Sequence, residues 1–271
     1  MSDEKEIKTL SQELKTQREM YFHTPIFYKD IKDSAKLNEH LLKHILTWKK
    51  RDEKGINRTN SLGWHSAVDM HTRKEYDNLL RHLFDMQKEI YTAEGYHPDT
   101  EPFCDTMWAN VNYKYSHNRN HVHPGAQWSG VYYVKVPENS GHIWFTDPCG
   151  QRHLDLPIMD NSKTKPVHYW REVNYTPIEG RLIMFPGWLT HEVAQNMSNL
   201  KGEKGWRVSV SFNFKQRWKT DQYKPPVGGH DRLQKTIEDL NDKLSKHIKF
   251  IDSTYANLKN PIEAARKWLG K

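Results

Sequence analysis

The feature that most constrains the fold of this 271-residue chain is a central region of short apolar and aromatic runs separated by turn residues. The connections between the runs contain Gly and Pro, as in PENSG, DPCG, PIEG and FPGW. Short runs with such punctuation predict a β-sandwich or β-barrel rather than a sheet built from βαβ units. The expected strands span residues 106–115, 128–136, 142–145, 180–185 and 206–214.

Helical patterns flank this region on both sides. Residues 3–20 and 34–50 carry apolar side chains at helical spacing, and a third helix is expected up to Ile90. Thr72 and Glu75 have the spacing of a capping box ahead of that third helix.

The region after residue 218 is polar and again helical in pattern. Its apolar stripe predicts a helix that packs on its own domain, with a homodimer seam through this C-terminal helix as the alternative. The expected division is a helical support region at 1–100, a β core at 101–218 and a helical extension at 219–271. The stripe consists of Leu233, Ile237, Leu240, Leu244, His247 and Ile251.

Charge and composition narrow the classes of function. The net charge is +7, but acidic residues are interspersed among the lysines and no zinc-finger or RNA-binding motif is present, which argues against nucleic acid as the partner. Two distant cysteines do not form a disulfide framework. The charged N-terminus is not a signal peptide, and no apolar run has the length to cross a membrane. A soluble, cytoplasmic protein is therefore expected.

Three histidines form the candidate metal site. His121 and His123 are two residues apart, so on an extended chain both side chains point to the same face. His191 follows a later strand-like run and a Pro-Gly turn, which can aim its ring at the same point. Two imidazoles from one segment and a third from a distant one supply the several directions that a metal ion requires.

Arg207 opens the last apolar run, WRVSVSFNF. A charged side chain at the start of such a strand is costly unless it is paired. Its guanidinium suits a two-pronged contact with a carboxylate, and Ser209 shares its face. An exposed arginine at a strand end is the alternative reading.

With these motifs, the chain resembles the iron(II)- and 2-oxoglutarate-dependent oxygenases, and in particular a bacterial and phage branch of them. The resemblance is carried by HVHPGAQWSGVYYV and GRLIMFPGWLTHEV, with support from TPIFY and GWHS. It covers roughly residues 22–215.

The resemblance implies a mainly β core with the double-stranded β-helix, or jelly-roll, fold and flanking N- and C-terminal α-helices. It implies Fe(II), 2-oxoglutarate and O2 as cofactors, in a reaction that couples decarboxylation to oxidation of a substrate C–H bond. His121 would be the first metal ligand, His191 the distal one, and Arg207 the partner of the far carboxylate of 2-oxoglutarate. The residues that would assist at the cofactor are Ser209, Tyr133 or Tyr132, and Asn112 or Asn110.

One position departs from the pattern of the superfamily, in which a carboxylate usually stands two residues after the first histidine. This chain has His123 there, which leaves zinc, nickel or copper as alternative metals. Asp105 or Asp147 would restore a carboxylate only if the fold brings one of them close.

Two other classes of function are also open. A cupin-type metalloenzyme would use the histidines, with Gln127 in its motif, but would have no use for Arg207. A catalytically inert jelly-roll would serve as an interaction or assembly protein. The motifs leave the organic substrate open, either a small molecule or a peptide side chain.

Overall fold

In a computed structural model the chain divides into two compact units, residues 1–217 and 218–271. The structure describes residues 19, 22–160, 162–219, 237–249, 263, 266, 269 and 270. The helix expected at 3–20 lies, apart from Glu19, outside the described residues, and so do the stripe residues Leu233 and Ile251.

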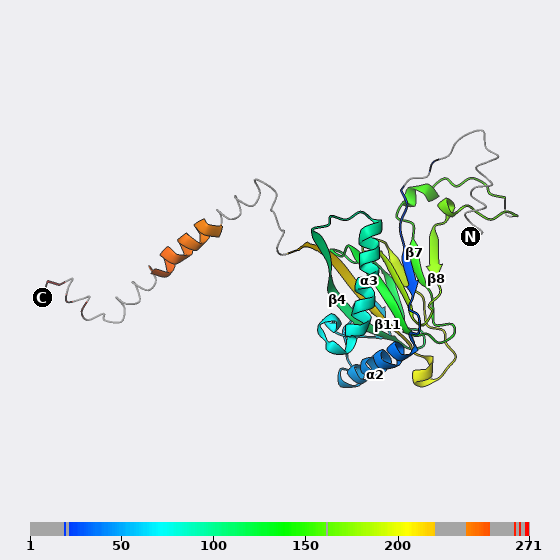
Figure 1. The fold of residues 1–271 in the computed structure, drawn as a ribbon, viewed down its shortest axis with the longest axis horizontal. Coiled ribbons are helices and arrows are strands. Elements are labelled where there is room, and N and C mark those ends of the chain that lie inside the picture. The colour runs from blue at the N-terminus through cyan, green and yellow to red at the C-terminus, as the bar shows by residue number, and fades with distance from the viewer. Residues whose placement is uncertain are drawn as a thin grey trace. The chain divides into compact units, whose positions relative to one another are not determined.

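The first unit is built from two β-sheets (Figure 1). One sheet has six strands in the order β1-β9-β6-β11-β4-β3, and the other has five in the order β2-β5-β10-β7-β8. In the first sheet β6 runs antiparallel to both β9 and β11, and in the second β10 runs antiparallel to both β5 and β7. Strands distant in sequence therefore alternate within each sheet, as in a jelly roll. The strands are β1 (Phe27–Asp30), β2 (Asn60–Ser61), β3 (Trp64–His65), β4 (Thr100–Asn112), β5 (His117–His121), β6 (Trp128–Lys135), β7 (Ile143–Thr146), β8 (Glu172–Tyr175), β9 (Arg181–Pro186), β10 (His191–Val193) and β11 (Arg207–Trp218).

The predicted fold class, a mainly β jelly roll with flanking helices, is confirmed. The five expected strands correspond to β4, β6, β7, β9 and β11. The remaining strands, of two to five residues, were not expected, because runs this short rarely display a period. The equally short β7 was recognised by its apolar and aromatic residues instead. The segment between the helices α2 (Ala35–Arg51) and α3 (Asp77–Ala93) contains β2 and β3.

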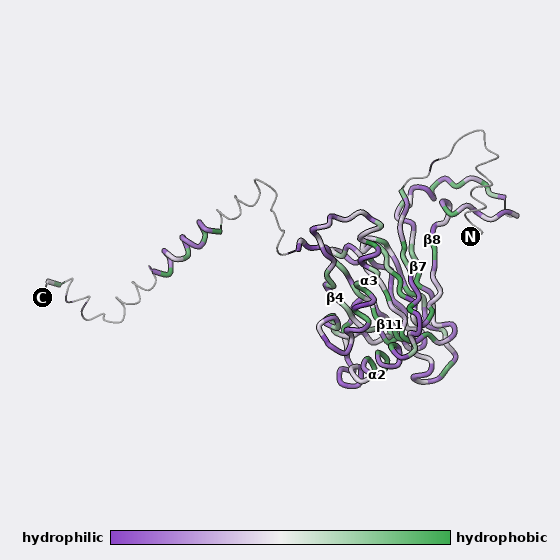
Figure 2. Tube along the Cα trace, viewed as in Figure 1, coloured by the Kyte–Doolittle hydropathy of each residue, from purple (hydrophilic) through white to green (hydrophobic). Residues whose placement is uncertain are grey.

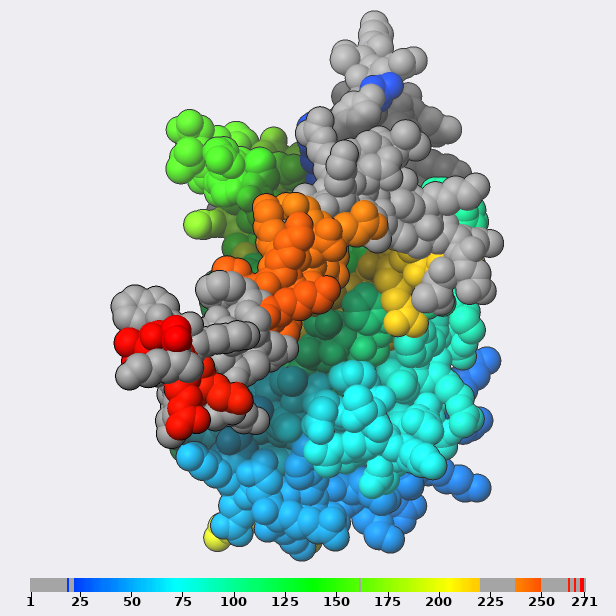
Figure 3. Space-filling view, turned by 90° about the vertical axis from the view of Figure 1, so that its left-hand side faces the viewer, coloured from blue at the N-terminus to red at the C-terminus, as the bar shows by residue number. Residues whose placement is uncertain are grey.

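Two helices, α2 (Ala35–Arg51) and α3 (Asp77–Ala93), cover one face of the six-stranded sheet. Leu41 of α2 and Leu83 of α3 are fully buried in one cluster with Tyr132 and Phe212 of the sheet. Figure 2 shows hydrophobic stretches concentrated along the strands and on these helices. In Figure 3 the blue and cyan segments that contain the helices gather on one side of the first unit.

The start of α3 differs from the expected capping box. No side chain caps the helix, and the Thr72 hydroxyl donates instead to the carbonyl of Asp69 within a short 3-10 turn, Met70–Thr72. A second 3-10 turn, Lys74–Tyr76, leads directly into α3. The Thr72–Glu75 spacing therefore predicted correctly that a helix begins nearby, but two 3-10 turns stand where a capping box was expected.

The other face of the six-stranded sheet looks toward the second sheet. Val131 and Tyr133 of β6 pack in a small cluster with Ile143 and Phe145 of β7. Gly130 is required where the layers are tight, because a Cβ there would lie 2.4 Å from the Ile183 carbonyl oxygen and from the Phe212 ring. The apolar packing between the sheets is smaller than on the helix side, and it leaves room for a cavity.

In the second unit, residues 237–249 are helical. Along this helix the stripe residues Ile237, Leu240, Leu244 and His247 are exposed, and Ile248 is a further exposed apolar side chain. A homodimer through this helix stays a prediction. Within the residues that the structure describes, no helix combines the length and the hydropathy that a membrane crossing requires.

Candidate metal centre and cofactor pocket

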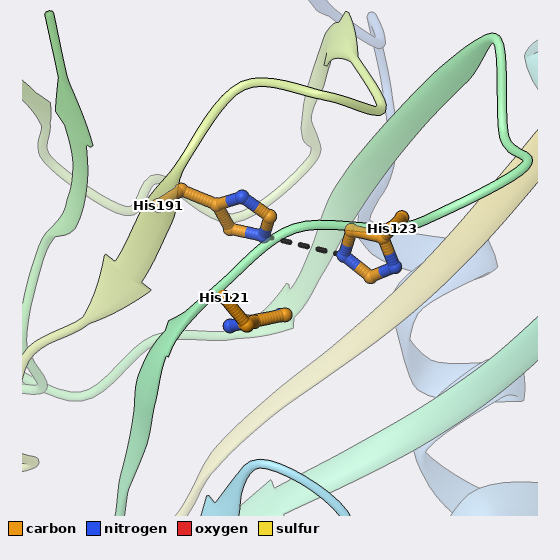
Figure 4. Close-up of side chains that lie close together, drawn as sticks. All are labelled: His121, His123 and His191. Atoms are coloured by element: carbon orange, nitrogen blue, oxygen red, sulfur yellow. Dashed lines mark hydrogen bonds between the residues drawn. The ribbon is translucent and has the colours of Figure 1, made fainter. Parts of the chain in front are cut away.

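Three imidazoles from two strands and the turn after one of them meet between the sheets. His121 ends β5, His123 follows it by two residues, and His191 begins β10. His191 and His121 are direct partners in the pairing of β10 with β5, so backbone register alone sets them side by side. One ligand atom from each of the three rings lies within 4.8 Å of the other two (Figure 4).

Backbone carbonyls fix two of these rings. Nδ1 of His121 is 2.6 Å from the carbonyl oxygen of Arg119, and Nδ1 of His191 is 2.8 Å from that of Leu189. A carbonyl only accepts, so Nδ1 carries the proton in each ring and Nε2 keeps its lone pair. Hydrogen bonds of this kind, from the nitrogen that does not bind the metal, orient histidine ligands in metal sites.

The three rings are neutral at physiological pH. Burial lowers the pKa of His121, lowers that of His123 to about 4 and lowers that of His191 to about 3. The rings also lower one another's pKa, because two adjacent imidazolium charges repel. Neutral imidazole is the form that binds a metal ion, so the site needs no deprotonation before it does so.

The donor set fits one metal ion. Nε2 of His123 lies 3.3 Å from Nε2 of His191, and Figure 4 shows these two atoms facing each other. Two imidazole nitrogens that each bind one cation at about 2.1 Å are separated by roughly 3 Å. The side chains are thus already spaced as ligands of a shared ion.

No carboxylate joins the three histidines among the described residues. Asp105 is paired with Lys215 at 3.0 Å, and Asp147 is 2.8 Å from Nε2 of His153. Gln127 contacts Gln216 instead of the histidines. The departure seen in the sequence therefore persists in the fold, with three imidazoles in place of two and a carboxylate.

Arg207 is a buried cation without an acidic partner. Its side chain is 1% exposed, and Nη1 donates to the carbonyl oxygens of Ser140 and Gly141. No carboxylate of a described residue pairs with it, and burial lowers its pKa to about 10, so it stays charged at neutral pH. A charge buried in this way is costly unless an anion completes the site. The exposed-arginine reading is wrong, because the strand directs this side chain inward.

Tyr132 and Tyr133, alternatives in the sequence, point to opposite faces of β6. Tyr132 packs on the helix side, and its hydroxyl donates to Oδ1 of Asn38 at 2.6 Å. Tyr133 lines the cavity, and its hydroxyl has no hydrogen-bond partner among the described residues. Burial raises the pKa of Tyr133 to about 12, so this hydroxyl remains a donor. Tyr132 is therefore removed from the candidate site.

A cavity of about 490 Å³ joins the histidines to Arg207. Ser209 faces it from β11, and Asn110 and Asn112 face it from β4. Oδ1 of both asparagines is buried without a partner, while Nδ2 of Asn110 donates to the hydroxyl of Ser211. The sequence-predicted residues, apart from Tyr132, thus line one cavity.

Two further cavity residues escaped the sequence reading. Trp108 and His65 line the same cavity, and their rings stack with centroids 5.4 Å apart. The alternation that identified Asn110 and Asn112 on β4 also includes Trp108, so the signal was present. Three other tryptophans of the β core do not line this cavity: Trp128 is buried on the helix side, Trp144 faces away from His191 on β7, and Trp188 is 55% exposed.

Comparison with known proteins agrees with this geometry. Residues 106–213 match the profile of a protein family described as "Putative 2OG-Fe(II) oxygenase". The fold is similar to that of a Pseudomonas putida prolyl-4-hydroxylase, with 14% identity, 72% of this chain and 94% of that chain covered, and a TM-score of 0.51. It is also similar to that of SnoN, a non-heme α-ketoglutarate-dependent epimerase from nogalamycin biosynthesis, with 11% identity, coverage of 76% and 84%, and a TM-score of 0.50. Among curated proteins, none matches the chain significantly.

Proposed function

We propose that this chain, whose β core is that of a 2OG-Fe(II) oxygenase, is a hydroxylase in which His121, His123 and His191 hold the metal and Arg207 binds 2-oxoglutarate. The observation that supports the proposal most strongly is the buried guanidinium of Arg207. It shares one cavity with the three imidazoles and has no acidic partner in the described chain.

The two ends of the cavity suit two different ligands, a metal ion at the histidines and a carboxylate at Arg207. One ring nitrogen from each of the three imidazoles lies within 4.8 Å of the other two, which suits a divalent cation. Arg207 at the other end suits the far carboxylate of a dicarboxylic acid, and the hydroxyls of Tyr133 and Ser209 are placed to donate to the same group. When bound, Fe(II) and 2-oxoglutarate supply the oxidation, in which O2 is consumed, 2-oxoglutarate becomes succinate and CO2, and a substrate C–H bond is oxidised.

The protein's own contribution is to bind, to orient and to exclude water. The hydrogen bonds from His121 and His191 to backbone carbonyls keep their rings fixed without cofactor. Phe145 and Phe185 pack against His191, with ring centroids 6.0 and 4.6 Å from its ring, and they shield that side of the centre from water. The organic substrate is expected to enter the remaining part of the cavity, on the side of Asn110 and Trp108.

The replacement of the usual carboxylate by His123 changes the charge balance. Three neutral ligands leave the full charge of a divalent metal to be balanced by the cofactor. We expect the anionic end of 2-oxoglutarate at the metal to be held more strongly than with a carboxylate ligand, because no negative ligand competes with it.

Reconstitution of the full chain tests this function. Purified protein is loaded with Fe(II) under nitrogen, its metal content is measured, and succinate release from 2-oxoglutarate is followed after addition of air. We expect about one iron per chain and slow succinate release even without a substrate. His121→Ala and His191→Ala should each lose iron and succinate release.

The same assay separates the alternatives. A cupin-type metalloenzyme would retain metal but release no succinate, and Arg207→Ala would leave its properties unchanged. An inert jelly-roll protein would retain no metal. Either outcome would refute the proposed function.

A further inference from the structure

A column of aromatic rings in the wall of the cavity runs from His65 through Trp108 to His123. The rings of His65 and Trp108 are nearly parallel, at 10° and 5.4 Å between centroids. Trp108 in turn contacts His123 at 5.8 Å and 34°. His123 is stacked on His191 at 5.1 Å and 13°. Side chains from β3 and β4 of one sheet thus reach a ring that follows β5 of the other.

His123 differs from the other two imidazoles in how its ring is held. His121 and His191 are each fixed through Nδ1 by a backbone carbonyl. Nδ1 of His123 has no hydrogen-bond partner among the described residues, and the residue lies beyond the end of β5. Its backbone N–H donates to the carbonyl of Gly187 at 2.8 Å, which anchors the main chain but does not orient the ring.

His65, at the end of the column away from the metal site, is held in place by hydrogen bonds. His65 is 4% exposed, and its Nδ1 donates to the carbonyl of Ser66 at 2.6 Å. The Ser66 backbone N–H donates to the Ala109 carbonyl, and the Ser66 hydroxyl accepts from the Ala109 N–H at 2.9 Å. The GWHS segment is thereby tied to β4 at the residue that follows Trp108.

We propose that Trp108, supported by His65, is a positioning residue that holds the ring of His123 toward the metal ion. The stacked rings orient the ring of His123, as a backbone carbonyl orients the rings of His121 and His191. A histidine ligand needs such support because both of its side-chain torsions must be fixed before Nε2 faces the ion. This inference rests on the proposed function, since it assumes that His123 is a ligand. Loss of such orienting groups typically weakens metal binding by about 10- to 100-fold.

Co(II) binding to the full chain under nitrogen tests the proposal, with the ion's visible absorption as a report of ligand geometry. Trp108→Leu removes the ring, and we expect about 10-fold weaker binding together with a changed spectrum. Trp108→Phe keeps an aromatic ring at this position and should recover most of the affinity. Trp144→Leu, a strand tryptophan on the face away from His191, is the matched control and should bind Co(II) as the wild type does.

A double-mutant cycle with His123→Ala shows whether Trp108 acts through this ring. In the His123→Ala background, Trp108→Leu should have no additional effect on affinity. If Trp108→Leu weakened Co(II) binding equally in both backgrounds, or did not weaken it in the wild type, the positioning role would be refuted. The metal site itself would be unaffected by that result. If the wild type bound no Co(II), the proposed metal centre would fall and this inference with it. Circular dichroism and the thermal midpoint of each variant exclude loss of folding as the cause.

Discussion

The two faces of the six-stranded sheet are built on opposite principles. The face toward α2 and α3 is apolar and continuous, with Leu41 and Leu83 fully buried against it. The face toward the second sheet carries Arg207, Asn110 and Asn112, all at least nine-tenths buried, and Oδ1 of both asparagines has no partner in the described chain. One side stabilises the fold, and the other gives up stability to hold polar groups in position for ligands.

The helix side should give the largest loss of stability. Leu83→Ala removes a fully buried side chain from this cluster, and the free energy of unfolding should fall by about 2 to 5 kcal/mol. Urea denaturation of the metal-free protein measures it. Metal affinity under native conditions should not change, because Leu83 lies on the face away from the histidines. A parallel loss of affinity would mean that the two faces are not independent.

Arg207 provides the opposite test on the cavity side. Arg207→Met replaces a buried charge by an apolar side chain of similar length, so the free energy of unfolding should change by no more than about 1 kcal/mol. The affinity for 2-oxoglutarate, measured by calorimetry on the metal-loaded protein under nitrogen, should fall by about 2 kcal/mol or more, or roughly 30-fold. Metal should remain bound. Unchanged cofactor affinity would remove Arg207 from the site.

Tyr132 and Tyr133 allow the two faces of the sheet to be compared by removing only the hydroxyl oxygen of each side chain. Tyr132→Phe breaks the hydrogen bond to the buried Asn38 and should cost about 1 to 3 kcal/mol of stability, with no effect on 2-oxoglutarate. Tyr133→Phe removes a hydroxyl with no partner in the described protein, so stability should hold while 2-oxoglutarate binds about 5- to 10-fold more weakly, as loss of one hydrogen bond predicts. Equal behaviour of the two variants would contradict the division between the faces.

The smallest effect is expected at His123. His123→Asp introduces the carboxylate that is usual at this position in the superfamily, so metal binding should survive, with a stability change within about 1 kcal/mol. Elemental analysis after desalting measures the bound metal. Loss of folding in this variant would indicate that the imidazole has a structural role instead.

The sequence predicted those parts of the molecule in which the repeat of apolar side chains, or a motif, is long enough to be recognised. The long strands β4 and β11 alternate, β6 is rich in β-branched and aromatic residues, and His121, His191 and Arg207 stand at strand ends where a motif could be recognised. It could not decide between Tyr132 and Tyr133, because both faces of β6 are buried and alternation only says that the two residues point apart.

Other features depended on tertiary contacts that no local pattern encodes. Strands of two or three residues, such as β3 and β10, form only because a longer neighbour pairs with them. The stacking of His65 on Trp108 joins residues from two strands, and neither residue alone suggests it. Which face of a strand points inward is likewise set by the opposing sheet and not by the strand's own sequence.

We propose above all that a single cavity holds a divalent metal on three imidazoles and 2-oxoglutarate on Arg207. Anaerobic addition of Fe(II) and then 2-oxoglutarate to the full chain, followed by visible absorption spectroscopy, tests this directly. We predict a charge-transfer band that requires both additions, that is lost in His121→Ala, and that needs much more 2-oxoglutarate in Arg207→Met. A wild-type protein that shows no band, or a band that Arg207→Met shows at the same cofactor concentration, would contradict it.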